Sequence, residues 1–313
     1  MVFFRSPALL ACLTSVALAP ALPALAGDET VSGSIGVGLA NLYATETVHS
    51  DGMKISHLDW ESRGVKVLRG ALDVEVGGGW TVRAEGKVGI DGDGQMTDYD
   101  WVWPFYANTS KGGWSDRSVH DDNRLDHYYT GSIEISRRLF GDHIQNLNFG
   151  LGGRYTDVKW SAYGGNFIYS VDAPRDTIGS FSKDERGISY QQKIPVLYAT
   201  LNGSQDLGRW RLTGALEAGA TIKAKDVDDH WMRDLRFKDE LAVSAMFGGK
   251  AGVEYKLTQG ISLYLDGSFE TTDFRKGNIK MNNTVSGETT TYKDSAAGSF
   301  AAVYIGTGIR GSF

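Results

Sequence analysis

Long segments of alternating apolar and polar residues constrain the fold of this chain more than any other feature. In residues 80–90, for example, Trp80 and Val82 lie on one side of the alternation, and Arg83 and Lys87 lie on the other. Successive side chains of a β-strand point to opposite faces, so this segment has an apolar face and a charged face. A soluble β-sandwich would have to bury the charges or expose the apolar face, whereas a membrane barrel turns the apolar face to lipid.

About ten such segments follow one another along the chain, and an even number of antiparallel strands is the rule for single-chain outer-membrane barrels. Closure also removes sheet edges that lipid would not tolerate. We therefore predict an all-β fold, a ten-stranded antiparallel transmembrane β-barrel. The expected strands are residues 31–47, 54–76, 80–100, 123–140, 145–160, 187–203, 208–226, 237–257, 260–273 and 297–313.

The connections between these segments alternate in length. Short turn sequences occur at residues 77–79, around Gly141, at 205–207 and at 258–259, while the other connections are long, polar and rich in aromatic residues. Outer-membrane barrels have short periplasmic turns and long extracellular loops. We therefore expect both chain ends, including the terminal Phe313, on the short-turn side.

Residues 1–26 have the pattern of a secretory signal peptide, in which Arg5 precedes a long apolar run that ends in small residues. We expect residues 27–313 to form a single barrel domain. The chain has one cysteine, Cys12, which lies in this peptide. The mature chain would therefore have no thiol for a disulfide, a nucleophile or a metal site.

The charge of the mature chain excludes a further class. Removing Arg5 from the 32 basic residues leaves 31 against 38 acidic residues, a net charge of −7. Nucleic-acid-binding domains need clustered positive charge, so we expect no nucleic-acid partner. After residue 26 no apolar run is long enough for a membrane helix, which leaves strands to cross the membrane.

Three carboxylates and an imidazole are crowded at the end of the seventh expected strand, in Asp226-Val227-Asp228-Asp229-His230. In an extended chain Asp228 and His230 project to the same side. A carboxylate placed in this way orients the imidazole and raises its basicity, which suits a general base. The alternative interpretation is a solvated acidic loop tip.

Other stretches at the long-loop end also carry side chains that could take part in catalysis or metal binding. Asp98 and Asp100 end the third expected strand and could face the acidic cluster across the barrel mouth. Ser118 and His120 could be a nucleophile and its base, but no nucleophile-elbow sequence surrounds them. Residues 91–95 resemble half of a calcium loop but lack its central glycine and distal glutamate, which favours a polar turn.

Three motifs together resemble those of the omptin family of outer-membrane endopeptidases. They are Asp-x-Asp-Trp at residues 98–101, Trp-Ser-Asp-x-Ser-x-His at 114–120 and Asp-x-Asp-x-His at 226–230, in the family's order and spacing. The similarity extends over essentially the whole mature chain, from residues 58–60 to the last strand. It implies a barrel in the bacterial outer membrane that rises well above the bilayer, with a groove across its top that faces the exterior.

The resemblance also implies the catalytic residues of a metal-free protease. Asp98 and Asp100 form one pair, Asp228 and His230 form the other, and a water molecule is held between them. His230 would be the general base and Asp228 the carboxylate that orients it. The first pair would share a proton and would bind the water or stabilise the oxyanion.

Strict alternation conflicts with this assignment, because it places both pairs on the outward face that carries Trp80 and Trp210. A bulge or register break must intervene on each strand. Gly92 and Gly94 predict such a break on the third strand, whereas no glycine marks one near Asp226.

Omptins prefer peptides with basic residues beside the cut, which acidic pocket residues select by charge. Asp226 matches an acidic position of the pocket for the residue before the cut, and Asp116 matches the position for the residue after it. Where the family has a glutamate on the first strand, gapless alignment gives Ala40, while Glu46 lies in the adjoining loop and does not align. We therefore expect weakened selection for arginine before the cut.

The family binds lipopolysaccharide on its outer wall and needs it for activity. Tyr155, Asp157 and Lys159 match the family's aromatic, acidic and basic pattern, and Lys193 and Lys238 match its other cationic positions. Each lysine would pair with a phosphate as a point charge. The alternative is an ordinary aromatic and cationic girdle at the membrane interface. The expected partners of the monomer are thus a peptide or protein substrate and lipopolysaccharide, which acts as a lipid activator without other cofactors.

A rival function from another class is a catalytically silent barrel, either an adhesin or a narrow pore. All four catalytic positions carry the required residue types, which favours the protease.

Overall fold

The computed structural model describes residues 30–313, so the predicted signal peptide at residues 1–26 lies outside the described residues. The described chain forms one antiparallel sheet of 16 strands. Among these residues no helix has the length and apolar character needed to cross a membrane. The elements are β1 (Val31–Ser50), β2 (Met53–Glu75), β3 (Trp80–Ile90), β4 (Asp93–Asp100), η1 (Lys111–Gly113), β5 (Asp116–His120), β6 (Asp122–Gly141), β7 (Gln145–Tyr163), β8 (Asn166–Tyr169), β9 (Thr177–Ser180), β10 (Arg186–Leu207), β11 (Trp210–Thr221), β12 (Lys225–His230), η2 (Trp231–Arg233), β13 (Leu235–Ala242), β14 (Ala245–Lys256), β15 (Ile261–Asn283) and β16 (Thr289–Ser312).

The sheet closes on itself, because β1 pairs with β2 on one side and with β16 on the other. Four barrel strands are each interrupted once, so that β3 continues into β4, β5 into β6, β11 into β12, and β13 into β14. When each interrupted pair is taken as one strand and the β8–β9 hairpin is left out, the barrel has about 10 strands. The predicted fold class is confirmed. The alternation pattern does not predict the short hairpin of β8 and β9, which extends the sheet beyond β5.

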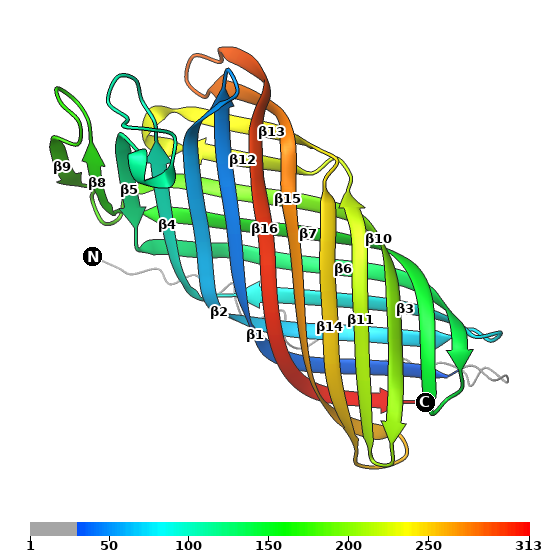
Figure 1. The fold of residues 1–313 in the computed structure, drawn as a ribbon. Helices are drawn as coiled ribbons and strands as arrows, with labels where there is room; N and C mark the ends of the chain where they lie inside the picture. Colours follow the sequence, from blue (N-terminus) through cyan, green and yellow to red (C-terminus); the bar gives the residue numbers. More distant parts are fainter. Residues whose placement is uncertain (1–29) are drawn as a thin grey trace.

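The short and long connections lie at opposite ends of the barrel, as predicted. Figure 1 shows tight turns at the lower right, near the end of β16, while β4, β5, β8 and β9 gather at the upper left. The short turn predicted at residues 205–207 is wrong by a few residues. Those residues still belong to β10, and the chain turns at Gly208, whose φ of 68° is a backbone conformation that favours glycine.

Large apolar side chains cover the outer face of the lower barrel. Ile133 and Leu216 are each 67% exposed, as expected for side chains that contact lipid instead of a protein core. The C-terminal residue closes this end, because the amide of Phe313 donates to the Val31 carbonyl at 2.8 Å.

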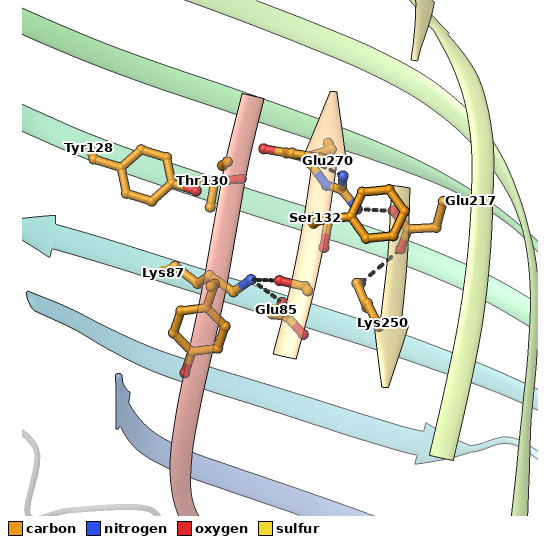
Figure 2. A pocket seen from close by; sticks show the side chains of 13 residues that line it. Glu85, Lys87, Tyr128, Thr130, Ser132, Glu217, Lys250 and Glu270 are labelled. Atoms are coloured by element: carbon orange, nitrogen blue, oxygen red, sulfur yellow. Dashed lines mark hydrogen bonds and ion pairs between the residues drawn. The ribbon is translucent and has the colours of Figure 1, made fainter. Parts of the chain in front are cut away.

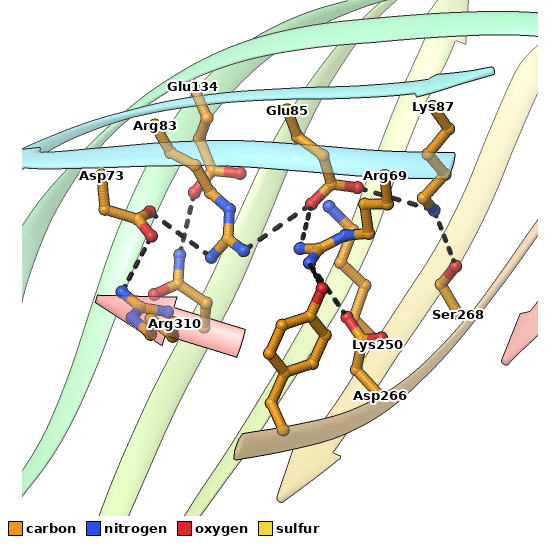
Figure 3. A network of polar contacts seen from close by, with 12 residues as sticks. Arg69, Asp73, Arg83, Glu85, Lys87, Glu134, Lys250, Asp266, Ser268 and Arg310 are labelled. Atoms are coloured by element: carbon orange, nitrogen blue, oxygen red, sulfur yellow. Dashed lines mark hydrogen bonds and ion pairs between the residues drawn. The ribbon is translucent and has the colours of Figure 1, made fainter. Parts of the chain in front are cut away.

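The lumen of the lower barrel is filled with paired charges. Arg154 donates to Glu270 at 2.5 Å and also bonds to Glu217, which Lys250 contacts at 2.9 Å (Figure 2). One level lower, Arg69 donates to Glu85 at 2.8 Å within a network that runs down to Asp73 and Arg310 (Figure 3). These residues come from strands all around the barrel, so the network ties opposite walls together and occupies the lumen.

The strand interruptions reverse which side chains face inward. On β3 the inward residues are odd-numbered and include Glu85, but the chain turns at Asp91 and Gly92, with φ values of 62° and 127°, and β4 presents even-numbered residues inward. On the seventh barrel strand the same reversal occurs at residues 222–224, where Lys223 has a φ of 54°. A break was expected on each of the two strands. Glycines marked the position of the first break in the sequence, whereas nothing in the sequence marked the second break, at Lys223.

A stack of aromatic rings separates the lumen network from the upper barrel. The rings of Trp60 and Tyr190 lie 5.4 Å apart and nearly parallel, and Trp160 stacks on both. All three side chains are essentially inaccessible to solvent. This layer forms a rigid floor beneath the cavity mouth in which the candidate catalytic residues lie.

Candidate active site

The two carboxylate-bearing strands β4 and β12 lie on opposite walls of the upper barrel. After the breaks described above, Asp98 and Asp100 on β4 face inward, and so do Asp228 and His230 on β12. The register extends both walls, because Asp98 is opposite Leu58 of β2 and Asp228 is opposite Tyr190 of β10. Local backbone breaks thus resolve the conflict with strict alternation.

Asp228 holds the imidazole of His230 in place. The Nε2 atom of His230 lies 2.6 Å from the Oδ2 atom of Asp228, and the ring packs edge-on against Phe237 at 5.3 Å. The Asp228 side chain is 2% exposed, whereas that of His230 is 15% exposed. A buried carboxylate at Nε2 fixes the tautomer and leaves Nδ1 as the nitrogen that can accept a proton.

Asp98 and Asp100 form a coupled acidic pair. Burial, and then the charges of Asp100 and Asp228, raise the pKa of Asp98 well above its usual value. Burial also raises the pKa of Asp100, against the lowering effect of a hydrogen bond from Ser56. Both carboxyl groups therefore retain a proton more readily than a solvent-exposed carboxyl group does.

The two walls lie within electrostatic reach of each other. The negative charge of Asp228 acts on Asp98, and the imidazole of His230 acts on Asp100. Arg233 belongs to η2, the short helical turn that follows His230. Its positive charge acts on both Asp98 and Asp100 of β4. The four predicted catalytic side chains therefore face the same interior space of the upper barrel, and we call this space between the two walls the groove.

Glu46 is a site residue that sequence alignment missed. It belongs to β1 and not to a loop, it faces the same side as Ala40, and it is 3% exposed. Burial, followed by the charges of Asp228 and Asp226, raises its pKa well above the usual value. The expectation that β1 offers only Ala40 to the pocket is thus wrong, because the hairpin after β1 is short and β1 extends six residues further on the same face. Continuing the alternation from Ala40 through Leu42 would have found it.

The two predicted substrate-binding carboxylates occupy different depths. Asp226 lies one inward position below Asp228, is 2% exposed, and accepts a hydrogen bond from the Tyr190 hydroxyl at 3.2 Å. Asp116 lies beside Asp100 on β5, near the rim, and it accepts bonds from the Ser115 hydroxyl at 2.6 Å and the Ser170 amide at 2.9 Å.

Ser118 and His120 are hydrogen-bonded, with 3.1 Å between Oγ and Nε2, although no motif around them predicts this contact. The two side chains are 4% and 2% exposed, and the imidazole stacks on Phe181 at 5.4 Å. Because Phe181 directly follows β9, we interpret this contact as packing of the β8–β9 hairpin against β5. Asp91, from the calcium-loop resemblance, pairs with Lys66 at 2.5 Å. Within residues 30–313 no cluster of three or more acidic, histidine or cysteine side chains could hold a metal.

The residues predicted to bind lipopolysaccharide lie on the outer wall. Asp157 of β7 is in register with Lys193 of β10, and its Oδ1 atom accepts bonds from His127 at 2.8 Å and Gln191 at 2.7 Å. Tyr155 and Lys159 lie two residues before and two residues after Asp157 on the same face of β7, and Tyr155 is 46% exposed. Lys238 of β13 lines an outer groove of about 450 Å³ together with Lys193. The sequence did not single out His127.

Comparison with known proteins agrees with this geometry. The model of the omptin family matches residues 27–313. This chain belongs to the omptin family. It is similar to the plasminogen activator of Yersinia pestis, with 28% identity over 88% of this chain and 87% of that protein, and to protease 7 of Escherichia coli O157:H7, with 27% identity over 81% of each. The crystal structure of the outer-membrane protease OmpT from Escherichia coli superposes with a TM-score of 0.85 at 23% identity, over 91% of this chain and 97% of that one.

Membership of the omptin family places the chain in the outer membrane, as predicted. The fold of OmpT is the fold of this omptin. Several of its relatives are named as outer-membrane proteases, which supports a protease function for this one as well.

Proposed function

We propose that this omptin is an endopeptidase that hydrolyses peptide bonds next to basic residues, with a water molecule activated between the Asp98/Asp100 pair and the Asp228/His230 pair. The observation that carries the proposal is the convergence of these four inward side chains from opposite walls of one groove above the membrane.

The chemistry follows from the protonation states that the geometry favours. His230 Nδ1 accepts a proton from the water as its oxygen attacks the peptide carbonyl carbon, and the Asp228 carboxylate stabilises the imidazolium that forms. The proton shared by Asp98 and Asp100 is donated as a hydrogen bond to the developing oxyanion. His230 then gives its proton to the leaving nitrogen as the carbon–nitrogen bond breaks, which yields a carboxylate and an amine.

The preference for basic residues rests on carboxylates along the groove. Glu46 and Asp226 lie below the Asp228 wall, where they would receive the cationic side chain before the cut. Asp116 lies beside Asp100 and would contact the side chain after it. Alignment of Ala40 with the family's glutamate had suggested that the pocket lacks its second carboxylate. Glu46 supplies this carboxylate, so we expect strong selection for arginine or lysine before the cut.

We also propose that lipopolysaccharide activates the enzyme through Tyr155, Asp157, Lys159, Lys193 and Lys238. The aromatic ring and the lysines lie on the outer wall just above the apolar band, where phosphate groups of an outer-leaflet lipid would be found. We propose that the protein acts as a monomer.

The pore alternative conflicts with the filled lumen. The ion pairs of Arg154 and Lys250 with Glu217, and of Arg69 with Glu85, span the interior at the level of the membrane (Figures 2 and 3). An ion would have to break several buried pairs to pass.

A cleavage assay tests the proposal. The protein is refolded with lipopolysaccharide and offered a fluorogenic dibasic peptide, and His230→Ala and Asp98→Ala are expected to lower kcat by about 10²-fold or more. His143→Ala and Asp184→Ala are matched controls, because both side chains are exposed and neither carries a role in the proposed site. If wild type is no faster than the groove variants across a peptide library, the protein is not a protease, and binding of host protein by the inactive barrel would favour the adhesin.

A further inference from the structure

Asp239 of β13 is a buried carboxylate that neither the sequence motifs nor the proposed reaction uses. It is directly opposite Asp226 of β12 in the strand register, and both side chains are 2% exposed. Its neighbours Lys238 and Glu240 are exposed on the outer wall, so alternation along β13 points the Asp239 side chain inward. The carboxyl groups of Asp226 and Asp239 are near enough to share a hydrogen bond when one of them is protonated.

Within residues 30–313, no cationic side chain forms an ion pair with Asp239. The titratable groups that face it are Asp226 and Asp228 from β12, Tyr190 from β10 and Glu46 from β1, while β15 places Ile279 opposite. Burial, and then the charge of Asp226, raise the pKa of Asp239 to about 10. Burial likewise raises the pKa of Asp226 to about 7.

Unsatisfied acceptors in this cluster point to a cationic ligand. One buried oxygen on each of Glu46, Asp226 and Asp239 receives no hydrogen bond from a backbone amide, a hydroxyl or a cationic group, and the amide oxygen of Gln192 beside them is also without a donor. Buried acceptors without donors are costly and uncommon in folded proteins. An ammonium or guanidinium group supplies three or five N–H donors and the opposite charge.

We propose that Asp239 is a third carboxylate of the pocket for the cationic side chain before the cut, and that the arriving cation displaces a proton held between Asp226 and Asp239. This rests on the proposed substrate class and adds a residue and a proton to it. The exchange is balanced: one proton leaves to solvent and one positive charge enters. The pocket therefore binds a cation more tightly as the pH rises, because the deprotonated form is the one that binds.

The proposal is tested by binding, in a background that cannot cleave. His230→Ala, refolded with lipopolysaccharide, is titrated calorimetrically with a peptide that contains one arginine and with the same peptide containing neutral citrulline. Two buffers with different heats of ionisation report the protons released. We expect release of about one proton at pH 7 with the arginine peptide, none with citrulline, and an affinity for arginine that rises by up to about tenfold per pH unit.

Adding Asp239→Asn to this background should abolish the proton release, flatten the pH dependence and reduce the preference for arginine over citrulline by about tenfold. Glu240→Gln is the matched control, because it removes the adjacent carboxylate on the outer face, where Glu240 pairs with Lys225 at 3.0 Å. An unchanged preference in the Asp239 variant overturns the inference, and so does binding of the arginine peptide without proton release in the protein that retains Asp239. Cleavage by wild type decides the proposed function separately.

Discussion

Two regions of this barrel bury many charged side chains, but the regions differ in whether those charges are paired with charges of opposite sign. In the lumen, Arg154 is paired with Glu217 and Glu270, and Arg69 is paired with Glu85. In the groove above, most of the carboxylates have no ion-pair partner. Among residues 30–313, the groove carboxylates that take part in no ion pair are Glu46, Asp98, Asp100, Asp116, Asp226 and Asp239, whereas Asp228 contacts His230.

The difference separates a structural region from a binding one. A buried charge is tolerated when a partner of opposite sign compensates it, so the charges of the lumen network need no ligand for their neutralisation. Buried groups of like sign instead retain protons and raise one another's pKa, as in the groove. Such an arrangement is unfavourable until a cation or a reacting group enters, and perturbed groups of this kind cluster at functional sites.

The largest expected effect tests whether the groove is the reacting region. Asp228→Asn keeps the shape of the side chain but removes the charge that holds His230 at 2.6 Å. We expect kcat to fall by about 10²- to 10⁴-fold with little change in thermal stability, measured with a fluorogenic peptide. Asp184→Asn, on an exposed loop, is the control. Retention of more than a tenth of the activity in Asp228→Asn would contradict the proposed role.

The lumen should respond to mutation in the opposite manner. Arg154→Leu leaves Glu270 buried without its partner and Glu217 with Lys250 alone, and we expect a loss of about 3–5 kcal/mol in the free energy of unfolding. Protein that remains folded should cleave peptides at the wild-type rate. Urea titration in lipid vesicles measures the first and the peptide assay the second. Adding Glu217→Gln and Glu270→Gln should restore most of the lost stability, and a lower kcat in folded Arg154→Leu would break the separation between the regions.

The unpaired carboxylates also predict how stability depends on pH. The pKa values of Asp226 and Asp239 are raised in the folded protein, so their contribution is fully present below the pKa of the unfolded chain, about 4, and is lost as pH rises through about 7 and about 10. Unfolding in urea should therefore become easier as the pH rises from 5 to 10, by up to about 1.4 kcal/mol per pH unit for each of the two groups. Asp239→Asn should flatten this dependence, and a profile of unchanged slope would show that the pair is not strained by its charge.

The smallest expected effect concerns the outer wall, where charges are exposed. Lys193→Ala removes a cation beside Asp157, and we expect the concentration of lipopolysaccharide that gives half-maximal activity to rise about fivefold, equivalent to about 1 kcal/mol. Activity at saturating lipid should be unchanged. Lys111→Ala removes a lysine of the η1 loop, away from this wall, and is the control. Equal effects of the two variants would favour a general cationic girdle over a specific lipid site.

The sequence by itself determined the barrel and the residue types of its site. Strict alternation over segments such as residues 80–90 can be satisfied only by a sheet with lipid on one face, and its count gave the strand number. The three motifs supplied the four catalytic candidates, because neighbours two apart on an extended chain share a face and so bring Asp228 beside His230.

Only the tertiary structure decided which side those residues face and which acids join them. The seventh barrel strand reverses its face at Lys223, which adopts a left-handed conformation without the glycine that would have marked it. Glu46 reaches the groove from β1, far from the motifs in sequence, and Asp239 reaches it from β13, which pairs with the motif strand β12. Alternation is a local property that any single break resets, whereas the grouping of carboxylates depends on strand pairing and barrel closure, which no local pattern encodes.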